Sequence, residues 1–243
     1  MKTLMVFDFD HTVVDDNSDT WVIRCLPSRT LPDSVRRLYR RGHWTDFMCK
    51  VMAYIGEQEV GPDGVRGVME AIPLTAGMVE LLSFIAEHKS SIDCIVISDS
   101  NAIFIDWILQ RSGLRAAVDQ VFTNPAKFNE RGHMEVASHH AHSCSRCPAN
   151  LCKRAVLERY LSEQSGTGVA YERVFYVGDG GNDLCPTACL RRHDVAMPRK
   201  GYALEKLLAR LQSRGGAASL RADVVSWSSG VDILKELQAS LWR

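Results

Sequence analysis

The sequence lacks an excess of charge of either sign. Its 243 residues include 29 Lys and Arg and 29 Asp and Glu, so the formal net charge is zero. A protein that binds nucleic acid through a basic field, or that carries an acidic solvating segment, would show a charge imbalance. We therefore expect no nucleic-acid partner.

Long hydrophobic runs are also missing. The first apolar run covers only residues 4–7 (LMVF), whereas a secretory signal needs about 7–15 apolar residues. No run approaches the roughly 18 apolar residues of a membrane-spanning helix. These absences lead us to expect a cytoplasmic protein without a membrane partner, and no pattern in the sequence indicates an oligomeric state.

What is present is the composition of an ordinary globular protein, with 46% apolar and 24% charged residues. Short apolar runs rich in β-branched residues alternate with helical patterns. The runs are LMVF (4–7), CIVI (94–97), RVFYV (173–177) and ADVV (222–225), and the clearest helical patterns cover 77–87 and 151–161. This alternation predicts an α/β fold, with a parallel sheet that has helices on both faces.

The chain between the first two predicted strands is too long for a single crossover connection. It contains three helical patterns, at residues 35–39, 47–54 and 65–71. We predict that residues 15–72 form a small helical cap, and that 1–14 and 73–243 form a Rossmann-like catalytic core. The stretch 213–220 (SRGGAASL) is the segment that we expect to be a flexible loop.

Acidic residues follow three of the predicted strands. The motifs are DFDHT (8–12), SDSN (98–101) and GDGGND (178–183). The carboxyl ends of parallel strands meet at one edge of a sheet, where open α/β proteins bind their ligands. Any single aspartate here could instead cap a helix, but three strand ends in order favour a common site. Converging carboxylates repel one another, and oxygen ligands suit Mg²⁺, which also binds phosphate.

These motifs, in this order, resemble those of haloacid dehalogenase superfamily phosphatases. DFDHT matches the DxDxT signature, Ser98 takes the Ser/Thr position of the second motif, Lys153 suits the third, and GDGGND the fourth. The resemblance implies a Rossmann-like fold with a helical cap inserted after the first strand. It also implies a Mg²⁺-dependent phosphomonoesterase that acts through an aspartyl-phosphate.

The resemblance implies four catalytic residues. Asp8 would be the nucleophile that attacks phosphorus, and Asp10 would protonate the leaving oxygen and then activate water. ATPases of the superfamily replace this second aspartate and dehalogenases lack it, so its presence favours ester hydrolysis. Ser98 and Lys153 would hold the phosphoryl oxygens.

The resemblance also implies the ligands of the magnesium ion. Asp8, the backbone carbonyl of Asp10 and Asp179 would bind the ion directly, and Asp183 would act on it through other ligands. The glycines around Asp179 would let the backbone pass close to metal and phosphate.

Longer stretches resemble one subfamily of vertebrate phosphatases, which contains phosphoethanolamine/phosphocholine phosphatase and a pyridoxal-phosphate phosphatase. They are residues 15–19, 97–101, 142–153, 176–186 and 195–202; residues 16–21, 100–107 and 224–233 look closer to the pyridoxal-phosphate enzyme. The resemblance implies that Asp19 and Asp99 bind the substrate, a small phosphate ester. The first expectation is pyridoxal 5'-phosphate hydrolysis; the alternatives are phosphoethanolamine or phosphocholine hydrolysis, or a phosphotransferase reaction.

A group of cysteines and histidines precedes Lys153. Cys144 and Cys147 form a CxxC motif, and Cys152 with His140 or His142 would complete a tetrahedral zinc site. The alternative is a reduced, thiol-rich loop that positions the neighbouring lysine. The other cysteines are interpreted as scattered buried thiols: Cys25, Cys49, Cys94, Cys185 and Cys189.

Overall fold

The computed structural model describes residues 2–40, 42–213 and 220–241. Residues 214–219 of the predicted flexible loop lie outside this range. Within the described part of the chain, no helix combines the length and the apolar character needed to cross a bilayer.

Strands and helices alternate along the chain. The strands are β1 (Lys2–Phe7), β2 (Ile92–Asn101), β3 (Gln120–Asn124), β4 (Ala126–Phe128), β5 (Met134–Val136), β6 (Tyr171–Gly178), β7 (Val195–Pro198) and β8 (Asp223–Val224). The α-helices are α1 (Ser18–Trp21), α2 (Asp33–Arg36), α3 (Trp44–Glu57), α4 (Pro62–Met69), α5 (Met78–Glu87), α6 (Ala102–Arg111), α7 (Lys153–Gly166), α8 (Leu184–Thr187), α9 (Ala203–Ser213) and α10 (Gly230–Leu241). Three short 3₁₀ segments are η1 (Val22–Cys25), η2 (Arg115–Ala117) and η3 (Gly181–Asp183).

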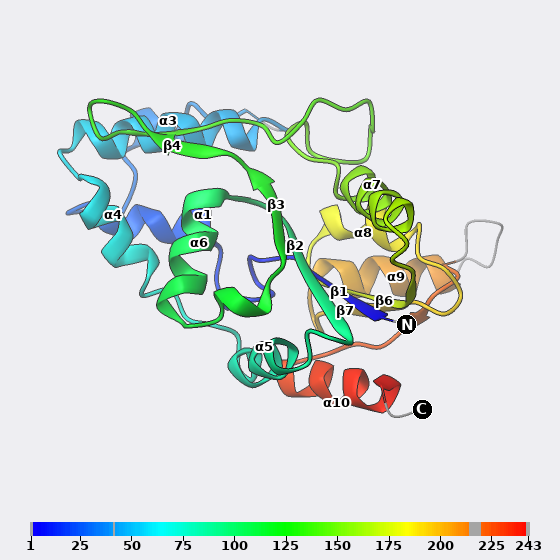
Figure 1. Ribbon diagram of the computed structural model, residues 1–243. Helices are drawn as coiled ribbons and strands as arrows, with labels where there is room; N and C mark the ends of the chain where they lie inside the picture. The colour runs from blue at the N-terminus through cyan, green and yellow to red at the C-terminus, as the bar shows by residue number, and fades with distance from the viewer. Residues whose placement is uncertain (1, 41, 214–219, 242–243) are drawn as a thin grey trace.

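The main sheet has six strands in the order β3-β2-β1-β6-β7-β8, and every neighbouring pair is parallel. The central strand β1 is apolar from Leu4 to Phe7, where both of its faces are covered. Leu4 and Val6 pack into one hydrophobic core, and Met5 and Phe7 into the other, as the twofold alternation of a strand requires. Helices α7 and α9 cover the first face, and α5, α6 and α10 cover the second (Figure 1). The predicted α/β fold is confirmed.

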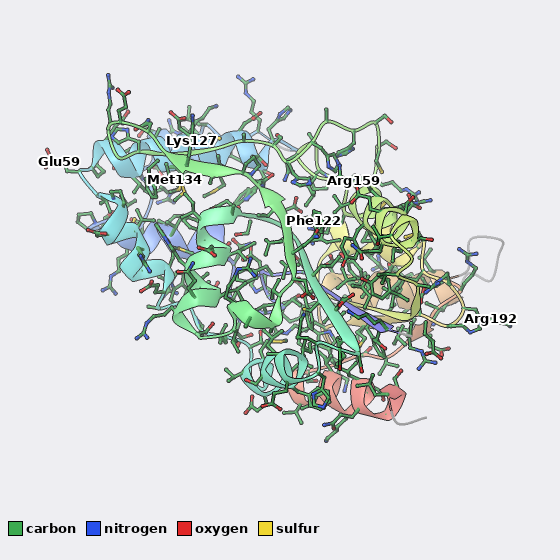
Figure 2. All side chains as sticks on the ribbon, in the orientation of Figure 1. Glu59, Phe122, Lys127, Met134, Arg159 and Arg192 are labelled. Atoms are coloured by element: carbon green, nitrogen blue, oxygen red, sulfur yellow. The ribbon has the colours of Figure 1, made fainter. Side chains whose placement is uncertain are left out.

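Helices α1 to α4 lie between β1 and α5 in the sequence, and Figure 1 shows α3 and α4 away from the main sheet. The antiparallel hairpin β4–β5 packs against α3. Met134 of β5 is buried and Lys127 of β4 is exposed; Figure 2 shows both on the hairpin beside α3. The hairpin lies outside residues 15–72, so the surroundings of α3 include a segment that the sequence analysis did not place there. The division into cap and core stays a prediction.

Candidate active site

The ends of β1, β2 and β6 meet around a cavity of about 300 Å³, which is within the size range of small-molecule sites. Asp8 follows β1 directly, Asp179 follows β6, and Ser98 lies in the last part of β2, where its pairing with β3 becomes irregular. Six of the eight predicted site residues line this cavity: Asp8, Asp10, Asp19, Ser98, Asp99 and Asp179. The structure thus brings together residues from three distant motifs.

Lys153 lies behind the cavity wall, with its side chain 1% exposed. It is the first residue of α7, and its Nζ lies 2.6 Å from Asp8 Oδ2 and 2.8 Å from Asp183 Oδ1. Burial alone would lower the pKa of Lys153, but the charges of Asp183 and Asp8 outweigh it and raise the pKa. A permanent ammonium group therefore faces the carboxylate of Asp8.

Asp183 is fully buried, and both of its oxygens are hydrogen-bonded. Oδ1 accepts from Lys153 Nζ and from the hydroxyl of Tyr176 at 2.8 Å, and Oδ2 accepts from the backbone N–H groups of Asp179 (3.1 Å) and Gly180 (3.0 Å). A Cβ at Gly178 would lie 2.5 Å from Asp183 Oδ2, so this position requires glycine. Asp183 thus orders the turn that carries Asp179.

Carboxylate oxygens of Asp8, Asp179 and Asp183 lie within 4.8 Å of one another. Burial raises the pKa of Asp8, and the charge of Asp183 adds to the effect; the same two causes raise the pKa of Asp179 to about 7. Three buried carboxylates face one ammonium, so the cluster has an uncompensated negative charge. A set of donors made only of oxygen fits a hard cation such as Mg²⁺.

Asp10 follows Asp8 by two residues and faces the same cavity. Its Oδ1 accepts the backbone N–H of Ser18 at 2.8 Å, at the start of α1. Burial raises the pKa of Asp10 to about 6, although the hydrogen bond from Ser18 opposes the shift. The hydroxyl of Ser18 contacts that of Ser100 at 2.7 Å, so the first turn after the motif is joined to β2.

Asp19 lies in α1 and is 7% exposed. Its Oδ2 accepts the indole N–H of Trp44 at 2.7 Å, which joins α1 to the first residue of α3. Burial raises the pKa of Asp19 to about 7, and the nearby charge of Asp10 contributes. Asp19 does not cap its helix, because that role belongs to Asn17, which accepts the N–H of Thr20.

Asp99 is held by two amides that the sequence analysis did not identify. Asn150 Nδ2 donates to Oδ1 at 2.8 Å, and Asn182 Nδ2 donates to Oδ2 at 2.5 Å. Asn182 belongs to the GDGGND motif and Asn150 lies three residues before Lys153, so both had a sequence context but no distinguishing charge. The carboxylate of Asp99 is therefore oriented by neutral donors.

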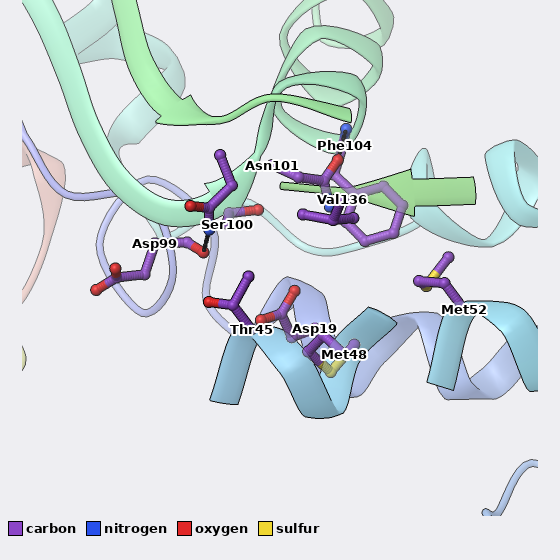
Figure 3. A pocket seen from close by; sticks show the side chains of 10 residues that line it. Asp19, Thr45, Met48, Met52, Asp99, Ser100, Asn101, Phe104 and Val136 are labelled. Atoms are coloured by element: carbon purple, nitrogen blue, oxygen red, sulfur yellow. Dashed lines mark hydrogen bonds between the residues drawn. The ribbon is translucent and has the colours of Figure 1, made fainter. Parts of the chain in front are cut away.

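A small recess of about 10 Å³ is also lined by Asp19 and Asp99 (Figure 3). Met48 and Met52 of α3 and Phe104 of α6 form its apolar wall. A volume of this size holds about one water-sized group. The two acidic residues thus lie next to an apolar wall that comes largely from helix α3.

The structure corrects the interpretation of the cysteines. Cys185 is not a scattered buried thiol, because its sulfur lies within 4.8 Å of the sulfurs of three others. His140 and His142 are not placed as the remaining ligands, because both rings hydrogen-bond to the backbone. We call this group the cysteine cluster: Cys144, Cys147, Cys152 and Cys185.

The six-stranded parallel sheet with its helices matches the fold of haloacid dehalogenase-like hydrolases. The chain is similar to a substrate-bound complex of phosphoserine phosphatase, with a TM-score of 0.58 and 15% identity, covering 97% of this chain and 98% of that one. It is also similar to a phospho-aspartyl intermediate analogue of phosphoserine phosphatase, with a TM-score of 0.59 and 17% identity over the same shares of the two chains. These likenesses establish the fold.

Sequence comparison identifies the family to which the chain belongs. The model of the family described as "Putative Phosphatase" matches residues 3–241. The chain is 51% identical over 238 residues to pyridoxal phosphate phosphatase PHOSPHO2 of Bos taurus, covering 98% of each protein. It is 42% identical over 240 residues to human phosphoethanolamine/phosphocholine phosphatase, covering 99% of this chain and 90% of the relative. The chain belongs to this family of phosphatases, which confirms the resemblance seen in its motifs.

Proposed function

We propose that this protein hydrolyses small phosphate monoesters with Mg²⁺, through a phosphoryl group carried on Asp8, and that pyridoxal 5'-phosphate is its first candidate substrate. The observation that carries the proposal is the buried contact of 2.6 Å between Lys153 Nζ and Asp8 Oδ2 at the wall of the cavity. A buried ammonium beside a carboxylate suits a group that must accept a phosphoryl dianion.

In the first step, a carboxylate oxygen of Asp8 forms a bond to phosphorus while the bond from phosphorus to the ester oxygen breaks. The carboxyl group of Asp10 gives its proton to the departing oxygen. In the second step, Asp10 takes a proton from a water molecule, whose oxygen bonds to phosphorus and releases inorganic phosphate and Asp8. Ser98 and Lys153 bind phosphoryl oxygens in both steps.

Asp8, Asp179 and the backbone carbonyl of Asp10 would hold the magnesium ion. When bound there, Mg²⁺ supplies positive charge to the phosphoryl oxygens and to the acidic cluster. Asp183 contributes by positioning: it holds Lys153 and the backbone amides of the turn before η3. Its two oxygens are already used, so we assign it no direct contact with substrate.

The choice of substrate depends on the end of the cavity that is lined by Asp19 and Asp99. The higher identity to pyridoxal phosphate phosphatase supports pyridoxal 5'-phosphate, and phosphoethanolamine and phosphocholine are the alternatives. We propose that Asp19 and Asp99 bind the part of the substrate that is not phosphate: a pyridinium, hydroxyl or ammonium group. In this proposal residues 15–72 act as a cap that closes over the substrate and excludes water.

A substrate panel tests this function. Release of inorganic phosphate is measured at constant Mg²⁺ from pyridoxal phosphate, phosphoethanolamine, phosphocholine, phosphoserine and glycerol phosphate. We expect the highest kcat/KM for pyridoxal phosphate. A phosphorylated acceptor formed in place of phosphate would favour the phosphotransferase alternative, and no turnover of any ester would contradict the proposal. We also propose a cytoplasmic location, which the free thiols of the cysteine cluster support and cell fractionation would test.

A further inference from the structure

We propose that the cysteine cluster binds one structural Zn²⁺ through four sulfur ligands. The Sγ of Cys144 lies 3.7 Å from that of Cys147 and 3.9 Å from that of Cys185, and all four sulfurs lie within 4.8 Å of one another. Zinc–sulfur bonds of about 2.3 Å in a tetrahedron place the sulfurs about 3.8 Å apart. These two separations from Cys144 match that geometry.

Other arrangements of four thiols fit the distances less well. A disulfide requires about 2.05 Å between sulfurs, so none of these separations is a disulfide bond. Ordinary packing of buried thiols would not require a CxxC pair, a residue at the start of α7 and a residue in α8 to converge on one point. Four soft thiolates in a tetrahedron select zinc rather than magnesium or calcium.

The cluster lies on an irregular stretch of chain, which is anchored near its end by the buried Leu151 and by the hydrogen bond from Asn150 to Asp99. Residues 137–152, between β5 and α7, contain neither helix nor strand, and a segment of this length inside a compact domain needs a means of stabilisation. The two histidines shape its backbone: His142 Nδ1 accepts the N–H of Cys144 at 3.2 Å, and His140 Nε2 accepts the N–H of Cys152 at 3.2 Å. These bonds direct the backbone near two ligands and leave coordination to sulfur.

The cluster joins the start of α7, which supplies Lys153, to α8, which directly follows Asp183. Cys152 immediately precedes Lys153, and Cys185 follows Asp183 by two residues. A zinc ion bound to both cysteines would tie the start of α7 to α8 and hold the lysine and the aspartate at their separation of 2.8 Å. Because four protein ligands leave no open position, the ion would act as a positioning element and not in the chemistry.

The site also has a route of entry for the metal. Cys152 and Cys185 are buried, while Cys144 and Cys147 are half-buried and lie on the irregular segment. Zinc can therefore load from the side of the CxxC pair. Four thiolates and one Zn²⁺ would carry a net charge of minus two, and Arg146 lies between two of the ligands in the sequence.

The test is the metal content of the full chain, expressed without an affinity tag in zinc-supplemented medium and passed over a desalting column in metal-free buffer to remove weakly bound ions. Elemental mass spectrometry should find about one zinc ion per chain. Cys147→Ser and Cys185→Ser should each lose it. Cys189→Ser is the matched control: it lies four residues after Cys185, its sulfur donates to Pro186 O outside the cluster, and it should keep the zinc.

Asp179→Asn should also keep the zinc, which separates this site from the acidic cluster and from the proposed catalytic function. If the cluster variants fail to fold, a mercurial titration of the wild-type chain still decides: zinc should leave in step with the modification of four thiols. The proposal is overturned if the wild-type chain holds less than about a tenth of an equivalent of zinc or contains iron in its place. It is also overturned if the chain is lighter by the mass of two hydrogen atoms because Cys144 and Cys147 form a disulfide.

Discussion

The acidic residues at the two ends of the cavity have different hydrogen-bonding partners. At the phosphoryl end, Asp8 and Asp183 share the ammonium of Lys153, at 2.6 and 2.8 Å. At the cap end, the carboxylates of Asp19 and Asp99 accept hydrogen bonds only from neutral groups, among the residues that the structure describes. The buried ammonium thus lies at the end where we propose that phosphate binds, and none of the hydrogen bonds to Asp19 and Asp99 at the other end comes from a charged group.

This difference indicates how the chain divides catalysis from selection. A dianionic phosphate can approach the first end because a cation is built in and an oxygen-rich metal site adjoins it. In the proposal, the carboxylates of the second end would repel phosphate and attract positive or hydrogen-bond-donating groups. A substrate with both kinds of group therefore has one favoured orientation in the cavity.

The largest expected effect comes from removing the proposed nucleophile. Asp8→Asn should lower kcat at least about a thousandfold for every substrate, because an amide cannot carry the phosphoryl group. Steady-state phosphate release is the measurement, and Asp63→Asn on the exposed surface of α4 is the control. Activity within tenfold of the wild type in a folded Asp8→Asn variant would refute the assignment.

Asp10→Asn should produce a loss that depends on the leaving group. General acid catalysis contributes about a hundred- to ten-thousandfold, so alkyl phosphates should lose most and activated aryl phosphates least. The comparison uses one alkyl and one nitrophenyl ester under the same conditions. Equal losses on both would mean that Asp10 is not the acid.

The effect of removing the metal should be reversible, and the loss of a single metal ligand should have a smaller effect than the loss of Asp8 or Asp10. EDTA should abolish turnover and Mg²⁺ restore it, whereas Ca²⁺ should inhibit because its looser oxygen shell misplaces Asp8. Asp179→Asn should raise the Mg²⁺ concentration for half-maximal activity by about ten- to a hundredfold. A magnesium titration of this variant that overlays the wild-type curve would exclude Asp179 as a ligand.

The smallest effect expected is a pH dependence at the cap end. The pKa of Asp19 is raised to about 7, so its carboxyl group is neutral below that pH and ionised above it. It is surrounded by the charges of Asp10 and Asp99 and by the indole N–H of Trp44. We therefore consider kcat/KM of the wild type divided by that of Asp19→Asn, with phosphoethanolamine as the substrate. This ratio should rise by up to about tenfold between pH 6 and 8, because only the wild type gains a carboxylate in this range.

The ratio cancels the ionisation of the phosphate itself, which both proteins experience. Glycerol phosphate provides the comparison, because it has no ammonium group for a carboxylate to bind. A ratio that stays flat for both substrates would show that ionisation of Asp19 does not control binding.

The phosphoryl end was largely predictable from the sequence. The apolar runs at 4–7, 94–97 and 173–177 coincide with β1, β2 and β6, and continuous apolar runs followed by acids are a strong pattern in a parallel sheet. The strands β3 (QVFTN) and β7 (VAMP) were not identified, because one is short and mixed in polarity and the other is four residues long and ends in proline.

The cap end and the cysteine cluster were less predictable. Asn150 reaches Asp99 from the segment before α7 and Asn182 from η3, and uncharged amides have no periodicity or spacing that marks them. The hairpin of β4 and β5 consists of two three-residue strands, which are too short for an alternating pattern. Cys185 lies 41 residues from Cys144 in sequence, so only the packing of α8 beside the start of α7 brings it into the cluster.

The measurement that tests the two-ended site most directly compares two substrates in the variants Asp19→Asn and Asp99→Asn. Asparagine at position 19 can still accept the hydrogen bond from Trp44, and asparagine at position 99 can still accept the one from Asn150. Its NH2 group would face Asn182, whose amide can turn its oxygen toward it, so the fold should persist. A hydrogen bond to a charged group contributes about 1.5–3 kcal/mol, so each variant should lower kcat/KM for pyridoxal phosphate or phosphoethanolamine by about ten- to a hundredfold. Glycerol phosphate should be hydrolysed nearly as well as by the wild type. A parallel loss on glycerol phosphate would contradict the account, because the two aspartates would then be structural.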